Sequence, residues 1–312
     1  MIIRYNVPVY DICWLNHAES GIIGTYYEPE NKAELEAVCQ ELFRQKKRFD
    51  LIGHTSNIYF LPGYNVDYMV STRKCNTYIE SEHEIVCDCG VPVMKLARKM
   101  TAEGIKGFEG LIDLPGTVAA SVYGNASCYG CSISQLLISC DVLCSDGKRK
   151  TLFPNDLRFT KRSSSLKRGE LSGVILSIKL RKEFGERDEI KRLADRNHQK
   201  RKQTQPGPSD NLGSIYFKSG GWSLYSCLPR MLSKIYEILF LILVKDRKEK
   251  KRRKMEFLFS LIGGADVFPY VYDWNRYIWK DECSHELFWK FHRLHQKMFK
   301  QSKFEIEIKG VK

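Results

Sequence analysis

The chain has 312 residues and a formal net charge of +13, from 50 Lys and Arg against 37 Asp and Glu. Its composition, 43% hydrophobic and 28% charged, is ordinary for a soluble globular protein, and its length predicts two or three domains. The excess positive charge favours anionic partners, among them nucleotides, other phosphates, nucleic acid and a membrane surface.

The N-terminus holds no basic segment followed by an apolar run, so we expect no signal peptide. The most apolar stretch, Ile235 to Val244, is too short to span a bilayer and contains Glu237. Eleven Cys without a secretory signal are typical of reduced thiols, which predicts a cytoplasmic protein. Cys128 and Cys131 form a CxxC with no second pair, so we predict structural thiols and no metal site.

The first predicted elements lead into a polar turn. Residues Asn31 to Lys47 have helical apolar spacing, and Asp50 to Ile52 predicts a short strand. The turn Gly53 to Asn57 follows, and then a second apolar run from Ile58 to Leu61. The turn is either a ligand-binding loop or an ordinary connection.

A glycine-rich stretch from Gly104 to Gly130 follows several predicted short strands (66–89) and a short helix (92–101). Pro115-Gly116 marks a tight turn, and the small, apolar residues 117–122 come next. Small residues let main-chain N–H groups face a ligand, as phosphate-binding loops do. A glycine-rich turn between buried strands is the alternative.

The second half begins with predicted strands at 136–144 and 174–180 and then a charged helix and linker at 183–202. The basic block Lys245 to Lys254 follows an apolar run, and it predicts a solvated helix face or insertion, with nucleic acid or a membrane surface as alternatives. A strongly helical run spans Ser284 to Gln301, and Phe304 to Gly310 predicts a terminal strand.

The glycine-rich stretch resembles the flavin-binding signature of the UDP-N-acetylenolpyruvoylglucosamine reductase family. The matching residues are Gly107, Glu109, Pro115, Gly116, Thr117, Val118, Val122, Asn125, Ala126, Tyr129 and Gly130. The resemblance implies an α+β fold, with a two-lobed FAD-binding module followed by a smaller α+β substrate domain. The expected boundaries are 1–70 and 71–184 for the two lobes and 185–312 for the substrate domain, with a basic helical insertion near 229–262.

The resemblance also implies the site residues. Those expected to bind FAD are Gly53, Ser56, Asn57, Pro115, Gly116, Thr117, Ser121 and Asn125. Three further matches imply catalytic roles: Arg162 holds the substrate carboxylate, Ser214 donates a proton, and Glu305 stabilises the intermediate. The chain departs from the family where His54 and Thr55 replace glycines, where Lys161 replaces Tyr, and where one residue is inserted after Ser214. We expect Thr55, as a β-branched residue, to be excluded from positive φ.

The resemblance implies the activity of a UDP-N-acetylmuramate dehydrogenase, an FAD- and NADPH-dependent reductase of an enolpyruvyl UDP-sugar in peptidoglycan precursor synthesis. Its partners would be the UDP-sugar and NADPH, with no specific nucleic acid and no membrane insertion, and it would be a monomer. One alternative is a diverged flavoprotein that acts on another sugar nucleotide. A second is a non-catalytic protein that binds an acidic partner through its basic block.

Overall fold

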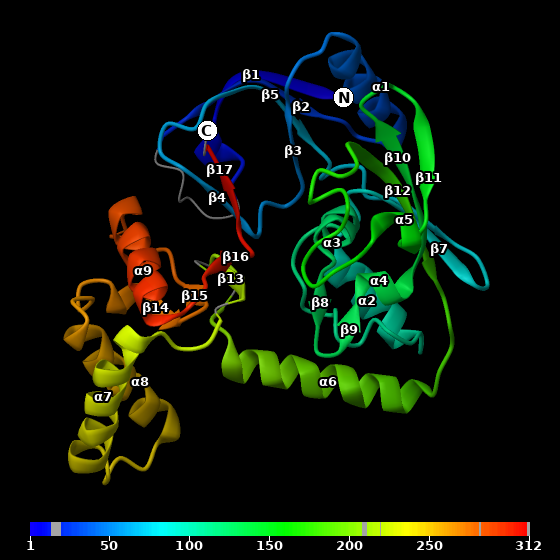
Figure 1. Ribbon diagram of the computed structural model, residues 1–312. Coiled ribbons are helices and arrows are strands. Elements are labelled where there is room, and N and C mark those ends of the chain that lie inside the picture. Colours follow the sequence, from blue (N-terminus) through cyan, green and yellow to red (C-terminus); the bar gives the residue numbers. More distant parts are fainter. Residues whose placement is uncertain (14–19, 208–210, 219, 281, 311–312) are drawn as a thin grey trace. The chain divides into compact units, whose positions relative to one another are not determined.

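The computed structural model describes residues 1–312 except 14–19, 208–210, 219, 281 and 311–312. The chain forms two compact units: unit 1 is Met1–Ser56 with Gly63–Gln205, and unit 2 is Asn57–Pro62 with Pro206–Val311 (Figure 1). The sequence placed a boundary after residue 184, but unit 1 extends through the charged helix, and unit 2 includes a short segment from the N-terminal region. Among the described residues, no helix is both long and apolar enough to cross a membrane.

Unit 1 has an α+β fold with two larger sheets and the small two-stranded pair β8–β9. The first is ordered β1-β2-β5-β3, from β1 (Ile2–Pro8), β2 (Ile22–Glu28), β5 (Val66–Ser71) and β3 (Asp50–Ile52). β1 pairs antiparallel with β2, whereas β2 and β3 both pair parallel with β5. Helix α1 (Lys32–Arg44) supplies the crossover from β2 to β3, and the Asn31 side chain caps it by accepting the Glu34 N–H at 3.0 Å.

The second sheet is antiparallel and is ordered β11-β10-β12-β7-β6. Its strands are β6 (Tyr78–Glu80), β7 (Glu84–Asp88), β10 (Leu137–Cys144), β11 (Arg149–Leu152) and β12 (Gly173–Arg181). The remaining elements of unit 1 are η1 (Val9–Asp11), α2 (Val93–Ala102), α3 (Val118–Gly124), β8 (Ser127–Cys128), β9 (Cys131–Ser132), α4 (Ile133–Leu136), α5 (Pro154–Leu157) and α6 (Arg187–Thr204). The main hydrophobic core lies between the second sheet and helices α1 to α4.

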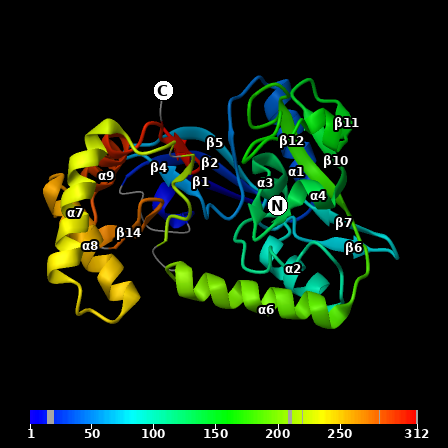
Figure 2. The same ribbon diagram turned by 60° about the horizontal axis from the view of Figure 1, so that its bottom comes forward.

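Helix α6, which the sequence predicted to lead into a linker, packs along unit 1 (Figures 1 and 2). The Arg187 Nε–H donates to Ala102 O at 2.9 Å, and His198 Nδ1 lies 2.7 Å from Asp113 Oδ2. The helix is therefore fixed to α2 and to the glycine-rich stretch.

The described residues of unit 2 form short strands, three α-helices and two 3-10 helices. Its strands are β4 (Ile58–Phe60), β13 (Tyr216–Lys218), β14 (Val271–Asp273), β15 (Arg276–Tyr277), β16 (Lys303–Phe304) and β17 (Glu307–Lys309). Its helices are η2 (Leu224–Ser226), α7 (Cys227–Phe240), α8 (Arg247–Leu261), η3 (Phe268–Tyr270) and α9 (His285–Met298). β4 pairs parallel with β17, and Tyr59 of β4 stacks on Phe288 of α9 with ring centroids 4.2 Å apart. Aromatic side chains of α9 therefore fill the core of this unit.

Candidate functional site

The first predicted cofactor loop, Gly53 to Ser56, follows directly from β3 and is held in place by Arg73. The Arg73 Nε–H donates to Gly53 O at 2.9 Å. The same guanidinium donates to Ile12 O and, at 3.3 Å, to Thr55 Oγ1. Because a guanidinium is a rigid fork of donors, these bonds fix the path of the loop. Sequence reasoning missed Arg73; its only signal was a basic residue just after a predicted strand.

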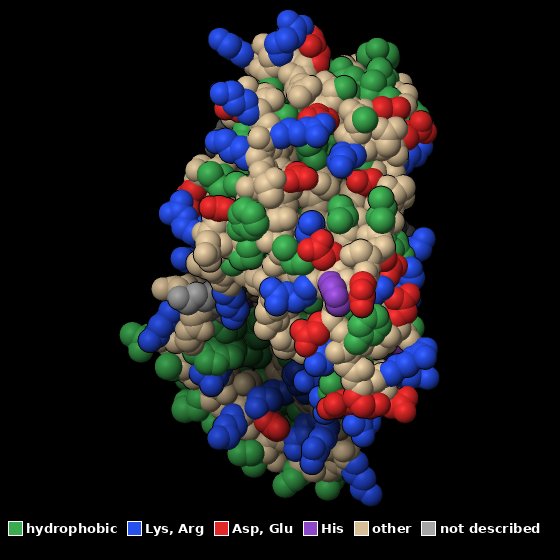
Figure 3. Space-filling model, turned by 90° about the vertical axis from the view of Figure 1, so that its right-hand side faces the viewer, with side chains coloured by type: hydrophobic (Ala, Val, Ile, Leu, Met, Phe, Trp, Pro, Cys, Tyr) green, Lys and Arg blue, Asp and Glu red, His purple; other side chains and the backbone are tan. Residues whose placement is uncertain are grey.

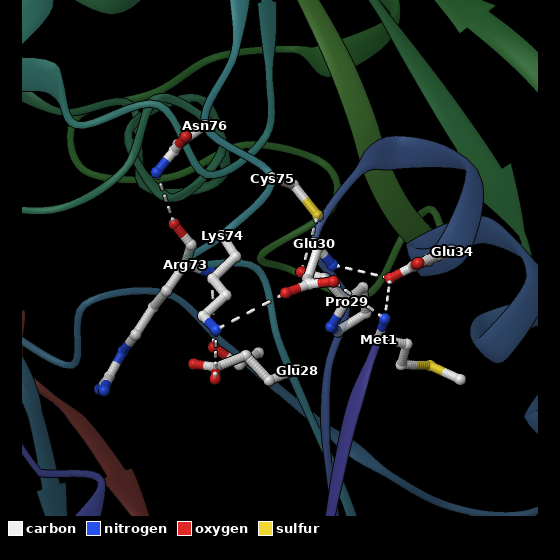
Figure 4. A network of polar contacts seen from close by, with 10 residues as sticks. Met1, Glu28, Pro29, Glu30, Glu34, Arg73, Lys74, Cys75 and Asn76 are labelled. Atoms are coloured by element: carbon white, nitrogen blue, oxygen red, sulfur yellow. Dashed lines mark hydrogen bonds and ion pairs between the residues drawn. The ribbon is translucent and has the colours of Figure 1, made fainter.

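The segment that carries Arg73 is anchored at its other side by a polar network (Figure 4). Lys74 Nζ lies 3.5 Å from Glu28 Oε2 at the end of β2, and the N-terminal amine lies 2.8 Å from Glu34 Oε2 on α1. Figure 4 shows the Arg73 side chain pointing away from this network. The network therefore holds the backbone while the guanidinium reaches the loop.

The loop keeps a backbone conformation typical of glycine at Thr55, one of the two positions where a glycine is replaced. Thr55 has φ +55°, so the expectation that a β-branched residue would exclude positive φ is wrong here. Its side chain is buried, and its Oγ1 donates to Ile12 O at 3.4 Å. These contacts, with those of Arg73, hold Thr55 in a conformation that is unfavourable for its type.

The rest of this loop has the character of an anion-binding turn. Within the described part of the chain, the backbone N–H groups of His54 and Ser56 donate no hydrogen bond. Burial, and secondarily the charge of Arg73, lowers the pKa of His54 below its ordinary value, so that its imidazole is neutral at pH 7. Free amides beside the Arg73 cation suit a phosphate group.

The second predicted loop, Pro115 to Thr117, abuts the first. A Cβ on Gly53 would lie 3.0 Å from Thr117 Oγ1, and a Cβ on Gly116 would lie 3.5 Å from Ser56 Oγ. Gly116 has φ +107°, which side-chain-bearing residues rarely adopt. The two small-residue loops, distant in sequence, are thus brought together in unit 1.

Helix α3 begins at the second loop, but its first amides are not available to a ligand. The N–H of Val118 donates to Val91 O and that of Ala119 to Cys89 O, while Thr117 Oγ1 accepts the N–H of Ala120. The prediction that main-chain N–H groups of this run face a ligand therefore does not extend to these three residues. Ser121, also predicted to bind the cofactor, is buried on this helix.

Asn125, at the C-terminal end of α3, is hydrogen-bonded to the turn that carries Arg162. Asn125 has a left-handed backbone, its Nδ2–H donates to Thr160 O at 2.8 Å, and its Oδ1 is buried without a partner among the described residues. Thr160 and Ser163 exchange backbone hydrogen bonds, and Arg162 lies at the tip of this tight turn with φ +60°. The turn that carries the predicted carboxylate-binding Arg162 is thus tied to a predicted cofactor residue.

These features fit an FAD molecule. Free amides at His54 and Ser56 would hold the pyrophosphate, and the glycine at 116 leaves room for close approach of a ligand. The buried Asn125 Oδ1 can accept a hydrogen bond from a ligand donor. No group of three or more His, Cys, Asp or Glu that could hold a metal occurs among the described residues.

The predicted proton donor Ser214 lies in unit 2, in the segment before β13. Asn57, predicted to bind FAD, uses its side chain here: its Nδ2 donates to both Leu212 O and Ser214 O at 3.1 Å. Gly213, with φ +77°, turns the chain just before the serine. The side chain of Asn57 therefore orients the Ser214 backbone.

A β-bulge follows Ser214, at the place where the resemblance implies one inserted residue. In the β13–β16 pair Tyr216 faces Phe304 and Lys218 faces Lys303, so two residues of β13 oppose one of β16. A bulge accommodates one extra residue without shifting what precedes it. The insertion thus leaves the Ser214 segment in register with the C-terminal strands.

Glu305 lies beside this segment. Its N–H donates to Ile215 O at 2.8 Å, and the N–H of Ile306 donates to the same oxygen at 3.3 Å. The single terminal strand expected over 304–310 is two strands, β16 and β17, with Glu305 at the break between them. The fold therefore brings the backbones of the Ser214 and Glu305 segments together within unit 2.

Comparisons with known proteins find similarity to an FAD-binding domain and to one group of reductases. Residues 24–152 match the model of an FAD binding domain. The chain is 30% identical over 193 residues to UDP-N-acetylenolpyruvoylglucosamine reductase of Streptococcus pneumoniae (strain Hungary19A-6), and the match covers 62% of this chain and 64% of that protein. The enzyme of strain ATCC 700669 / Spain 23F-1 is likewise 30% identical, with 60% of its length covered.

The fold as a whole has a counterpart in a solved structure. UDP-N-acetylenolpyruvylglucosamine reductase (MurB) from Thermus caldophilus superposes with a TM-score of 0.69 at 18% identity, covering 99% of this chain and 100% of that one. This likeness shows a shared fold, including the two-lobed FAD-binding module and the smaller α+β unit. The chain thus contains an FAD-binding domain, is similar to UDP-N-acetylenolpyruvoylglucosamine reductases over 62% of its length, and shares the fold of the Thermus caldophilus enzyme.

Proposed function

We propose that the protein is an FAD-dependent reductase that uses NADPH to reduce the enolpyruvyl ether of UDP-N-acetylglucosamine enolpyruvate, in peptidoglycan precursor synthesis. The observation that carries this proposal is the hydrogen bond from Glu305 N–H to Ile215 O, which holds the candidate intermediate-stabilising and proton-donating segments together. The matched part of the chain spans less than two thirds of the reductases from Streptococcus pneumoniae, so the reaction itself is our inference.

In this proposal each residue has one role. Bound FAD would supply the redox chemistry, by accepting a hydride from NADPH and passing one to the vinyl carbon of the substrate. The Arg162 guanidinium would bind the substrate carboxylate, and Glu305 would assist in stabilising the negative charge that develops beside it. The Ser214 hydroxyl would donate the proton to the neighbouring carbon, completing the addition of a hydride and a proton across the double bond.

Two other hydroxyls near the matched motifs are poorly suited to donate that proton. Ser164 is fully buried, and its hydroxyl donates to Tyr123 O at 2.7 Å. The Tyr216 hydroxyl lies 2.9 Å from His292 Nδ1 in the core of unit 2, and burial raises its pKa far above the ordinary value. Ser214, which is only partly buried, is the better candidate.

The cytoplasm is the compartment we propose. All eleven Cys are free thiols, and burial raises the pKa of Cys39, Cys87 and Cys140 to about 12. Buried, protonated thiols suit a reducing compartment.

The proposal is tested by separating the two half-reactions in a stopped-flow instrument. Ser214→Ala should leave the bleaching of bound FAD by NADPH nearly unchanged, because the hydroxyl takes no part in it. Reoxidation of the reduced flavin by the enolpyruvyl UDP-sugar should slow by about 10²- to 10⁴-fold. Ser214→Cys should recover part of the rate, and Ser260→Ala, on an exposed position of α8, should match the parent protein.

Each alternative function has its own outcome. Protein that stays colourless with excess FAD would favour a non-catalytic binding protein. Flavin that is bleached by NADPH but not reoxidised by the enolpyruvyl sugar would indicate a flavoprotein with another acceptor. If both Ser214 variants match the parent in both half-reactions, the role of Ser214 is wrong.

A further inference from the structure

Helices α7 and α8 of unit 2 pack side by side, and α8 covers one face of α7 (Figures 1 and 2). Tyr236 of α7 stacks on Phe257 of α8 with ring centroids 4.2 Å apart. Glu237 on the same face forms ion pairs with Lys254 and, at 4.0 Å, with Lys250. These contacts fix the orientation of α7 about its own axis.

The opposite face of α7 is apolar and exposed. Leu228, Met231, Ile235 and Ile238 recur every three or four residues, and their exposed fractions are 59%, 54%, 45% and 57%. The exposed apolar surface continues through Leu239 and Phe240 in the last turn of α7 and through Ile242 and Leu243 beyond it, and Leu243 is 88% exposed. We call these eight residues the apolar stripe. Monomeric proteins rarely expose so continuous an apolar surface unless it binds something.

Positive charge follows the apolar stripe directly. Between Lys245 and Lys254 there are eight Lys or Arg and only two acidic residues, Asp246 and Glu249. Four of these cations are exposed and form no ion pair with any residue that the structure describes; they are Lys245, Arg247, Lys248 and Lys251. We call these four the basic cluster. They lie in the loop after α7 and on the first turns of α8.

We propose that the apolar stripe and the basic cluster together dock unit 2 onto a membrane surface that contains anionic lipids. Aliphatic side chains of an amphipathic helix enter the interface between headgroups and acyl chains, and Lys and Arg beside them bind anionic headgroups. A second copy of this chain would place two basic clusters next to each other, and a nucleic acid would leave the aliphatic stripe in water. A bilayer surface is the occupant that satisfies both features.

The test is sedimentation of the purified full-length chain with lipid vesicles. Binding should be at least about tenfold tighter to vesicles of phosphatidylcholine with phosphatidylglycerol than to phosphatidylcholine alone, and salt should weaken it. Two variants separate the contributions. One replaces Met231, Ile235 and Ile238 by Gln in the apolar stripe, and the other replaces all four residues of the basic cluster by Gln.

Both variants should lose binding to anionic vesicles by roughly tenfold or more, with unchanged circular dichroism because all substituted side chains are exposed. Matched controls lie in unit 1. Ile79→Gln removes a side chain that is 76% exposed on β6, and a fourfold change of Arg192, Arg196, Lys200 and Lys202 to Gln removes the same charge from α6. These control variants should bind vesicles like the parent.

Several results would overturn the proposal. Equal sedimentation of the parent with neutral and anionic vesicles, or none with either, would exclude this surface as a lipid-binding site. A stripe variant that binds vesicles normally but shifts from dimer to monomer in light scattering would assign the stripe to a second copy. Tighter binding of heparin or duplex DNA than of vesicles, lost only in the cluster variant, would assign the cluster to nucleic acid.

Discussion

Thr55 is the residue at which the first predicted cofactor loop departs most from the expected backbone conformation. A left-handed conformation costs a residue with a side chain roughly 1–2 kcal/mol, and β-branching makes it worse. The structure offsets that cost with the Arg73 guanidinium, which binds Gly53 O, Ile12 O and Thr55 Oγ1 at once. The hydrogen bonds of Arg73 thus stabilise a positive φ that a glycine could adopt without such contacts.

This makes Arg73 the first residue to test. Arg73→Lys keeps the charge but loses the fork, so the loop should relax and FAD affinity should fall by roughly 10- to 100-fold. Titration of the apoprotein with FAD, followed by quenching of flavin fluorescence, measures the change. Arg252→Lys is the matched control, because the Arg252 guanidinium also donates to two backbone carbonyls, Val271 O and Phe268 O, and both lie in unit 2. Unchanged affinity in Arg73→Lys would show that the loop does not need the clamp.

Residue by residue, the sequence was most informative where a function rests on backbone. Gly53 and Gly116 could be recognised because a glycine, which lacks a side chain, is visible in the sequence itself. The structure brings their two loops together. Arg73 was not recognisable, because its partners are backbone carbonyls that only the fold brings near. The proximity of Ser214 to Glu305 depends on pairing between β13 and β16, which no local pattern encodes.

Among the elements, α9 carries the most pronounced titration behaviour. It buries His292 and His295, and burial lowers their pKa from 6.5 to about 4 and about 3, respectively. Each ring nitrogen Nδ1 faces a hydroxyl, of Tyr216 and Ser302 in turn. The folded form therefore keeps both imidazoles neutral at pH values where an unfolded chain would protonate them.

The lowered pKa values of these two histidines make the folded protein less stable at acidic pH. As the pH falls from about 6.5 toward 4, the unfolded chain binds protons that folded unit 2 excludes, so the free energy of unfolding falls. Urea unfolding at pH 7.5 and pH 5 should show a lower midpoint at the acidic pH. The double variant His292→Gln, His295→Gln should show a smaller difference between the two pH values, though it will be less stable at both. His83→Gln, at an exposed position, should keep the full difference.

The sequence predicted helices with a clear apolar spacing well. It did not predict whether the apolar side chains of a helix are buried or exposed. The expected helix over 31–47 is α1, and the expected helical run over 284–301 is α9. The apolar run in α7 did not predict that its side chains are exposed. Composition alone does not distinguish a helix buried in the core from a helix with an exposed apolar face.

Across the whole molecule, positive charge is unevenly balanced. Figure 3 shows basic and acidic side chains interspersed over most of one face. The basic cluster, in contrast, has few carboxylates near it in sequence. Replacing its four cations by Gln should therefore leave NADPH oxidation intact while vesicle binding is lost, because none of the candidate site residues lies in this segment. A large loss of turnover in assays without lipid would instead make the cluster part of the reductase.

The chain enters unit 2 twice, first through Asn57–Pro62 and again from Pro206 onward. On the ribosome, strand β4 therefore emerges long before Glu307–Lys309, the only strand with which it pairs among the described residues. Until translation reaches those residues, β4 is an open edge carrying Tyr59 and Phe60, two side chains that are fully buried in the finished fold. Unit 1 can close its sheets earlier, since all their strands precede residue 206. Unit 2 is thus the last part of the chain to fold. A nascent chain arrested before residue 307 would expose an unpaired, apolar strand that is prone to aggregate unless a chaperone binds it.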